Sequence, residues 1–271
     1  MSVRWFAAIV LACVAPIMML ASDEQGPHWG YGRDDGPPHW ASLDPDWATC
    51  ATGRAQSPVD LARAEEVDID APARNYGPTS LEIAHHEHVV DVLDNGHTIQ
   101  VDYDAGSTLT VSGRVYELQQ YHFHAPSEHT VDGRAYPMEM HLVHRSTQGE
   151  LVVMGVFIEE GAHNPAFEPV WSNFPTAAGE QRHLEHVEID IDDLLPTQSR
   201  HFRYEGSLTT PPCSEGVRWF VLAEPVRLSD EQIRTFTDIF SHNNRPTQPT
   251  NGRTILLGDP LDADGSEPDG S

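Results

Sequence analysis

The stretch Gln120-Tyr-His-Phe-His-Ala-Pro-Ser-Glu-His129 places three imidazoles, an amide and a carboxylate within ten residues. In an extended strand, successive side chains point to opposite faces. Gln120, His122 and His124 therefore share one face, and Tyr121 and Phe123 point to the other. A single strand thus brings two imidazoles together, which is half of a metal site.

A second alternating stretch, Met138-Glu-Met-His-Leu-Val-His144, supplies a third candidate ligand. His141 can meet the first two imidazoles if the two stretches pair as strands. A catalytic zinc ion takes three protein ligands and leaves its fourth tetrahedral position to water. The chain has sixteen histidines, however, so a chance His-x-His pair in an ordinary strand explains the spacing equally well.

Two neighbouring side chains favour the metal site. Gln120 and Glu139 each precede a proposed ligand by two residues and share its face. A metal-bound imidazole usually donates its other N–H to a carboxylate or a carbonyl group. Both residues can act as such acceptors, so we predict a site formed by His122, His124 and His141.

The first 21 residues combine an early arginine with a long apolar run that ends just before Asp23 and Glu24. This pattern predicts a secretory signal peptide over residues 1–21, and hence a periplasmic or secreted protein without stable membrane insertion once the peptide is removed. An uncleaved membrane anchor is the alternative, because the apolar run is long. Lipidation of Cys13 is not expected, because apolar residues continue beyond it.

Removal of the signal peptide leaves two cysteines, Cys50 and Cys213, in a chain bound for an oxidising compartment. Thiols tend to pair there, so we predict one disulfide between them. The alternative is two separate buried thiols.

The chain carries 42 acidic and 16 basic residues, for a formal net charge of −26, and contains no lysine. Such a surface repels nucleic acid and anionic membranes, which excludes both as partners. Acidic surfaces suit high salt, where repulsion between carboxylates is screened. A saline habitat is our hypothesis for this composition.

Short alternating runs broken by turn signals follow one another from Leu81 to Ile158 and predict a sheet. Asp94-Asn-Gly-His97 is typical of a hairpin turn. Residues 26–45 predict an irregular arm, because they are rich in Gly and Pro. Helices are expected at residues 166–174 and after a capping box at Ser229-Asp-Glu-Gln232. We expect one domain over residues 22–258 and a disordered acidic tail over 259–271.

Seven segments occur in a fixed order along the chain: Gln56-Ser-Pro-Val-Asp60, Asn95-Gly-His97, Gln120-x-His-Phe-His124, Ser127-Glu-His129, Glu139-x-His141, Ser207-Leu-Thr-Thr-Pro-Pro212 and Asn243-x-Arg-Pro-x-Gln-Pro249. Together they resemble the α-class carbonic anhydrases of the bacterial, secreted type. A single segment of this kind can arise by chance, but seven in this order do not.

This resemblance implies a mainly β (α+β) fold, with a central, mostly antiparallel twisted sheet of about ten strands, small peripheral helices, and zinc at the base of a conical cleft. It implies zinc-dependent, reversible hydration of carbon dioxide to bicarbonate and a proton by attack of zinc-bound hydroxide. In carbonic anhydrases, the standard example of this chemistry, zinc lowers the pKa of its bound water to about 7. Esterase activity is a conceivable side reaction.

The resemblance also implies roles for individual residues. His122, His124 and His141 are the implied zinc ligands, oriented by Gln120, Glu139 and the backbone carbonyl of Asn243. Thr209 accepts a hydrogen bond from the zinc-bound oxygen because its own proton is directed to Glu128. Thr209 and Thr210 contact the substrate, and an apolar wall receives carbon dioxide, formed by Val143, Val153, Leu208 and Trp219.

His97 is the implied proton shuttle, because an imidazole titrates near neutral pH. Judged by sequence alone, a histidine in an exposed turn more often has no such role. Tyr31, Asn95 and Gln100 are implied to hold the water chain between His97 and the metal. Sulfonamides and anions are the expected inhibitors, and the sequence leaves the oligomeric state open, a homodimer included.

The remaining histidines are expected to be structural or solvated. His129 is predicted to be a buried hydrogen-bonding residue, and His85, His86 and His88 are predicted to be solvated residues at a strand end. None of them is expected to take part in catalysis.

Three rival functions fit parts of the pattern. A cupin-type metal site would use His122, His124 and Glu128 as ligands, but the flanking glycines of that motif are absent. A zinc-less, carbonic-anhydrase-like extracellular binding module is the main alternative, although such relatives have lost ligand histidines. A histidine-rich zinc carrier would need neither the Thr209–Glu128 pair nor a shuttle.

Overall fold

The computed structural model describes residues 27–62, 64–66, 73–75, 89–103, 105–185, 187, 189–197 and 199–258. The expected signal peptide, the acidic tail and the histidines at positions 85, 86 and 88 lie outside this part of the chain. In the part that is described, no helix is both long and apolar enough to cross a membrane.

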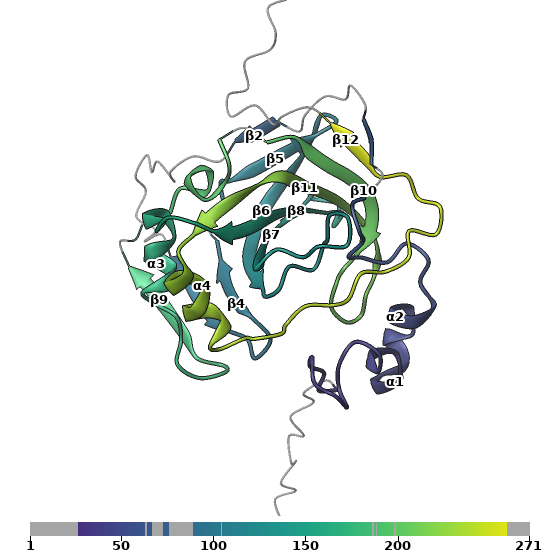
Figure 1. Cartoon of the computed structure of the whole chain (residues 1–271), viewed down its shortest axis with the longest axis horizontal. Coiled ribbons are helices and arrows are strands. Elements are labelled where there is room, and N and C mark those ends of the chain that lie inside the picture. The colour runs from purple at the N-terminus through teal and green to yellow at the C-terminus, as the bar shows by residue number, and fades with distance from the viewer. Residues whose placement is uncertain are drawn as a thin grey trace, which may run out of the picture.

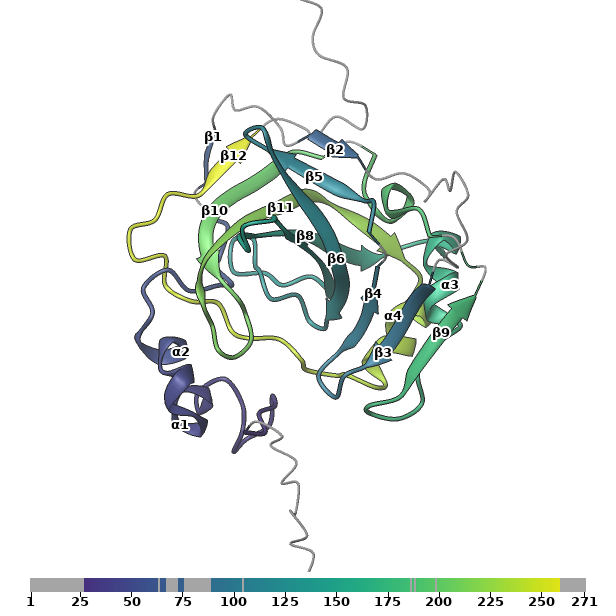
Figure 2. The ribbon, with the colours of Figure 1, turned by 180° about the vertical axis from the view of Figure 1, so that it is seen from behind.

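One sheet of 12 strands organises the described chain, in the order β1-β12-β10-β11-β8-β7-β6-β4-β3-β9, with β5 and β2 attached beside β6 (Figures 1 and 2). Most neighbouring strands are antiparallel, and the β1–β12 and β8–β11 pairs are parallel. The predicted fold class is confirmed. The strands are β1 (Glu65–Glu66), β2 (Ala73–Asn75), β3 (Val89–Asp94), β4 (Ile99–Asp102), β5 (Thr108–Val111), β6 (Arg114–His124), β7 (Met138–Arg145), β8 (Leu151–Glu160), β9 (Gln181–Glu185), β10 (His201–Ser207), β11 (Glu215–Leu228) and β12 (Leu256–Gly258).

Alternation along the central strands gives the sheet two apolar faces. Tyr121 and Phe123 of β6 and Met140 of β7 join the larger core, which also includes residues of α3 and α4. Val153 of β8 and Trp219 of β11 belong to a second, smaller cluster on the opposite face. The histidines of β6 therefore point toward the smaller cluster.

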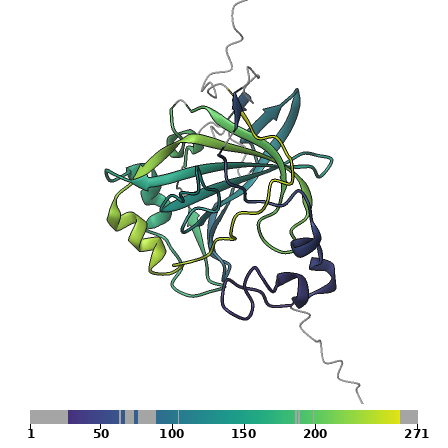
Figure 3. The same ribbon diagram turned by 45° about the vertical axis from the view of Figure 1, so that its right-hand side comes forward.

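The helices are few, short and peripheral among the described residues: α1 (Trp40–Leu43), α2 (Thr49–Thr52), α3 (Glu168–Trp171) and α4 (Asp230–Thr237), with 3-10 turns η1 (Pro45–Trp47), η2 (Pro165–Phe167) and η3 (Ile191–Leu194). Helices α3 and α4 lie together on one side of the molecule, and α1 and α2 lie on the other (Figures 1 and 3). The predicted capping box begins α4, because the Ser229 hydroxyl accepts the Gln232 N–H at 3.2 Å and the Gln232 side chain accepts the Ser229 N–H at 3.1 Å.

The amino-terminal arm is more ordered than its composition predicted. Trp40 begins α1, is fully buried, and donates its indole N–H to the Gly30 carbonyl at 2.9 Å. The expectation of a wholly irregular arm over residues 26–45 was therefore wrong at its end, because burial of Trp40 stabilises a helical turn that Gly and Pro do not favour.

The predicted disulfide is present and joins Cys50 of α2 to Cys213, in the loop between β10 and β11, across 163 residues. Buried Arg245 reinforces the same junction, because its guanidinium donates to the Cys50 and Ser57 carbonyls and lies over the Trp40 ring. The amino-terminal helices are thus tied to the loop that contains Thr209 and Thr210.

Candidate metal centre

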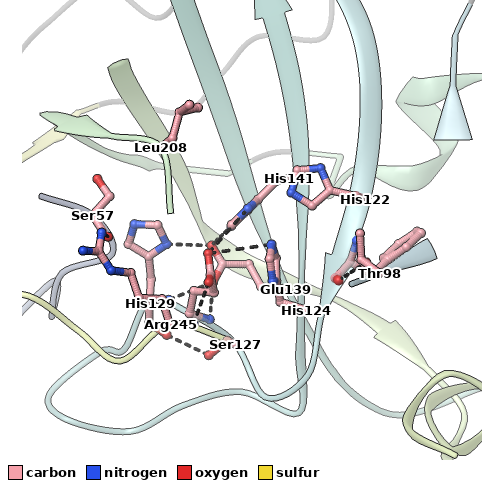
Figure 4. A network of polar contacts seen from close by, with 12 residues as sticks. Ser57, Thr98, His122, His124, Ser127, His129, Glu139, His141, Leu208 and Arg245 are labelled. Atoms are coloured by element: carbon pink, nitrogen blue, oxygen red, sulfur yellow. Dashed lines mark hydrogen bonds and ion pairs between the residues drawn. The ribbon is translucent and has the colours of Figure 1, made fainter. Parts of the chain in front are cut away.

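Pairing of β6 with β7 brings the three predicted ligand histidines together. His122 lies directly opposite His141, and His124 lies opposite Glu139. The three imidazoles offer nitrogen atoms that all lie within 4.8 Å of one another. Figure 4 shows the rings gathered on one face of these strands. Two strands of ordinary geometry therefore assemble a set of three nitrogen ligands that could hold a metal ion.

In each imidazole ring, one nitrogen donates a hydrogen bond to a neighbouring acceptor, and this fixes the tautomer of the ring. His122 donates from Nδ1 to the Gln120 side-chain oxygen at 2.8 Å, and His124 donates from Nδ1 to the Asn243 carbonyl at 2.7 Å. His141 donates from Nε2 to Glu139 at 2.9 Å. The remaining nitrogens, Nε2 of the first two rings and Nδ1 of the third, keep their lone pairs for a metal. Gln120, Asn243 and Glu139 each accept a hydrogen bond from one of the three rings.

Burial favours the neutral imidazole at His122 and His124, whereas at His141 burial is outweighed by Glu139, which raises the pKa of that ring. Burial lowers the pKa of His122 well below its usual range, and the neighbouring imidazoles of His124 and His141 add to this effect. Burial also lowers the pKa of His124, whose Nε2 atom has no hydrogen-bond partner among the described residues. A buried polar atom without a partner is costly, and a cation removes that cost. The residues present therefore fit a metal ion.

Glu139 connects the site to a buried polar network (Figure 4). Its Oε1 atom accepts from both His141 and His129, and its Oε2 atom accepts the backbone N–H groups of residues 128 and 129, each at 2.9 Å. Burial opposes ionisation of Glu139, but His129 and His141 outweigh it and hold its pKa well below the usual range. His129 continues the chain to the Tyr204 hydroxyl at 2.7 Å. As predicted, His129 is a buried hydrogen-bonding residue.

Glu128 lies beside two of the three candidate ligand nitrogens. Its Oε1 atom accepts the Arg245 backbone N–H at 2.7 Å, and its Oε2 atom lies 3.7 Å from His124 Nε2 and 3.9 Å from His141 Nδ1. Among the described residues, no hydrogen bond joins Oε2 to the buried Thr209 side chain. The expected Thr209–Glu128 hydrogen bond thus stays a prediction, although Oε2 has a free acceptor position for it.

The four residues of the predicted apolar wall lie in one cluster. Val153 and Trp219 are buried in it, and Val143 and Leu208 pack against it half-buried. The Trp219 ring lies 4.9 Å from the His141 ring, measured between centroids. The apolar cluster therefore borders the histidines directly. Thr210 lies in the same loop as Leu208 and is half-buried.

His97 lies half-buried in the predicted turn between β3 and β4, stacked on Trp29 with centroids 3.7 Å apart. Burial lowers its pKa, and the charge of nearby His28 lowers it further, whereas Asp35 and Asp94 oppose these effects. The stack joins the amino-terminal arm to the candidate shuttle.

The predicted water-path residues are linked to His97, because Asn95 accepts the His97 N–H and Tyr31 packs against Trp29, which stacks on the His97 ring. Asn95 donates to the Gln100 side chain at 3.3 Å, and Gln100 in turn donates to Asp102 at 2.6 Å. Tyr31 is half-buried and packs edge-on against Trp40. Burial raises the pKa of Tyr31 well above its usual range, so its hydroxyl stays protonated.

Sequence reasoning missed two residues next to the site. A Cβ atom on Gly155 of β8 would lie 2.7 Å from Glu139 Oε1, so only glycine leaves room for this carboxylate. The Thr98 hydroxyl donates to the Phe123 carbonyl, between two ligand histidines. A glycine inside an apolar strand is a sequence signal for close approach of another group, but the position of Thr98 carries no comparable signal.

Comparison with known proteins agrees with this geometry. The model of the eukaryotic-type carbonic anhydrase family matches residues 35–258. A carbonic anhydrase of Nostoc sp. is 44% identical over 234 residues, which span 84% of this chain and 85% of that protein. An α-carbonic anhydrase of Thermovibrio ammonificans, solved with the inhibitor sulfanilamide, gives a TM-score of 0.79 at 43% identity and covers 85% of this chain and 99% of its own.

A more distant neighbour is dioscorin, solved in complex with ascorbate. It gives a TM-score of 0.75 at 28% identity, over 86% of this chain and 98% of its own. The matched family segment contains all seven sequence motifs and the three converging histidines. The chain therefore belongs to the eukaryotic-type, or α-class, carbonic anhydrases.

Proposed function

We propose that this protein uses one zinc ion, held by His122, His124 and His141, to interconvert carbon dioxide and bicarbonate. The observation that carries the proposal is the hydrogen bonding at the back of the three rings, which leaves one lone pair on each to face a common point. Zinc bound there supplies the positive charge that ionises a water molecule near neutral pH.

The protein's own residues then orient the reactants. Thr209 accepts a hydrogen bond from the nucleophilic oxygen and directs its own proton to Glu128 Oε2, and this aims a lone pair at the substrate carbon. The cluster around Val143 and Trp219 receives carbon dioxide, a nonpolar molecule that offers few hydrogen-bonding groups. Thr210 contacts the bicarbonate that forms.

His97 carries the released proton to solvent. Its position beside Asn95 and Gln100 suits a transfer through ordered water. Its lowered pKa lets it release the proton readily to buffer. Tyr31 stays protonated and serves as a hydrogen-bonding group in this path rather than as a base.

The catalytic domain comprises residues 22–258, follows a signal peptide over residues 1–21, and works in the periplasm or outside the cell. The disulfide supports this location, because such bonds persist in oxidising compartments. Sulfonamides and small anions inhibit the enzyme, and activated esters are slow alternative substrates.

Zinc analysis combined with stopped-flow hydration of carbon dioxide tests the proposal on the purified chain. We expect one zinc per chain, hydration that an aromatic sulfonamide abolishes, and loss of both zinc and activity in His141→Ala. The matched control is His183→Ala, which removes an exposed histidine paired with Asp91. Stoichiometric zinc without hydration would instead favour a binding module, and a folded wild-type protein that binds no zinc would refute the proposal.

A further inference from the structure

The turn that presents His97 is fastened to the strand that carries His122 and His124. Strand β4 pairs with β6 through Gln100, opposite His122. Just before β4, the Thr98 side chain, rather than its backbone, forms the hydrogen bonds to β6. Its hydroxyl donates to the Phe123 carbonyl and accepts the Phe123 N–H at 3.2 Å. Thr98 is only 6% exposed, so a single buried hydroxyl satisfies both backbone groups of the residue between the two ligands.

The Asn243 side chain also joins this turn to β6 by hydrogen bonds. Its side-chain amide donates to the His97 carbonyl at 3.0 Å and to the Phe123 carbonyl at 2.9 Å, and its side-chain oxygen accepts the Ala125 N–H at 2.7 Å. Its backbone carbonyl accepts from the His124 ring. Asn243 is 2% exposed. One buried residue therefore contacts both the shuttle turn and a ligand imidazole.

These hydrogen bonds connect the backbone around His97 to strand β6. The His97 N–H is also bound, by the Asn95 side chain at 2.9 Å, and Trp29 stacks on the His97 ring. We propose that Thr98 and the Asn243 side chain are positioning residues that set the distance between His97 and the metal centre. This inference rests on the proposed function, in which His97 transfers protons.

The expected consequence is specific to proton transfer. The proton leaves after bicarbonate has formed, so its transfer enters kcat but not kcat/KM. Small misplacements of a catalytic group can cost on the order of 10²-fold in rate. A purely structural threonine would instead affect the thermal midpoint, or kcat and kcat/KM together. The two roles are therefore separable by kinetics.

Thr98→Val tests the proposal, because it keeps the branched shape and removes the hydroxyl. In weak buffer we expect kcat to fall about tenfold, with kcat/KM within about twofold of wild type and zinc retained. Concentrated imidazole buffer should restore kcat, and Thr98→Ser should behave as wild type. The double variant His97→Ala/Thr98→Val should be no slower than His97→Ala, because Thr98 acts only on the step that loss of His97 already removes.

The matched control is Ser199→Ala, which removes another buried hydroxyl. That hydroxyl accepts the Glu224 backbone N–H, and its proton goes to the Arg200 carbonyl at 2.8 Å or to the Glu224 carboxylate at 2.7 Å. This variant should change the thermal midpoint without changing the buffer dependence of kcat. If Thr98→Val does not fold, Thr98→Ala replaces it.

Wild-type buffer dependence in a folded Thr98→Val, or an equal fall in kcat and kcat/KM, would overturn the inference. An inactive wild-type protein would instead overturn the proposed function. An active wild type with an unaltered His97→Ala would remove His97 from the reaction and the inference with it.

Discussion

The three ligand imidazoles have chemically different acceptors behind them: an amide oxygen for His122, a backbone carbonyl for His124 and a carboxylate for His141. The carboxylate is the strongest acceptor, since charge-assisted hydrogen bonds are stronger than neutral ones. Glu139 shares that oxygen with His129, however, so its charge is divided between two rings. A metal ion held by His141 would therefore receive less negative charge from Glu139 than it would if His129 did not share that oxygen.

The pKa of His97 should depend on the neighbouring His28 side chain. Burial and the charge of His28 both lower its pKa, so we expect a titration midpoint below the usual 6.5. In His28→Ala the midpoint should rise, because a neighbouring positive charge that disfavours the imidazolium is gone. NMR titration of the His97 ring in the zinc-loaded protein measures this shift.

The lowered pKa of His97 also makes the stability of the fold depend on pH. A histidine whose pKa is lowered on folding destabilises the fold as the pH falls below its unfolded pKa. The contribution of His97 is therefore absent above about pH 6.5 and grows below it. His183→Ala, on the edge strand β9, is the control and should leave the His97 midpoint unchanged. An unaltered midpoint in His28→Ala would contradict the assignment.

Residues of the site differed in how readily the sequence predicted them. His122 and His124 share a face because of the two-residue period of a strand, which needs only local information, whereas His141 joins them only if the two stretches pair. Thr98 and the Asn243 side chain do not, because their partners at His97, Phe123 and Ala125 depend on the packing of β4, β6 and the segment after α4. A side-chain hydroxyl or amide that hydrogen-bonds to the backbone of another segment does not recur with any period, so the sequence around it gives no signal.

At the scale of elements, strand β8 supports the site without contributing a ligand. Gly155 lies opposite His141 in the β7–β8 pairing, and an added Cβ atom would lie 2.7 Å from Glu139 Oε1. We predict that Gly155→Ala displaces this carboxylate and weakens zinc binding by about 10- to 100-fold, the usual effect of disturbing a residue that orients a ligand. Competition with a chromophoric chelator measures the affinity.

Gly161→Ala, just past the end of the same strand, is the control. The three atoms nearest to its added methyl group belong to the Arg227 side chain and not to the site, so zinc affinity should stay unchanged. Wild-type affinity in a folded Gly155→Ala would show that the carboxylate can move aside without loss.

The sequence predicted the strands in which apolar and polar residues clearly alternate and the helix that begins with a capping box. The strands around the histidines and helix α4 are confirmed. Strands β10 and β11 were not predicted, although β11 is 14 residues long. Both are built into the sheet by long-range pairing with each other, with β8 and with β12, so their strand character depends on tertiary context.

For the whole molecule, the disulfide acts mainly on the unfolded chain. It closes a loop of 163 residues, for which loop-closure entropy gives about 5 kcal/mol at 25 °C. We predict that the double variant Cys50→Ser/Cys213→Ser unfolds about 10–20 °C below wild type, as measured by thermal denaturation of the zinc-loaded protein. Wild type treated with reductant should match the variant, whereas equal midpoints in the oxidised and reduced proteins would contradict this account.

The net negative charge of the chain should also affect the stability of the fold. A formal charge of −26 on 271 residues repels itself in the compact state more than in the expanded one. The Debye length falls from about 30 Å at 0.01 M salt to about 10 Å at 0.1 M, so added salt should screen this repulsion over molecular distances. We expect the thermal midpoint of the zinc-loaded protein to rise by several degrees between 0.01 and about 0.3 M sodium chloride and then to level off. Sucrose at equal osmolality is the control, because it lacks charge and should give no such saturating rise. An equal midpoint at both salt concentrations would show that the acidic surface does not destabilise the fold, and the proposed suitability for saline surroundings would lose its physical basis.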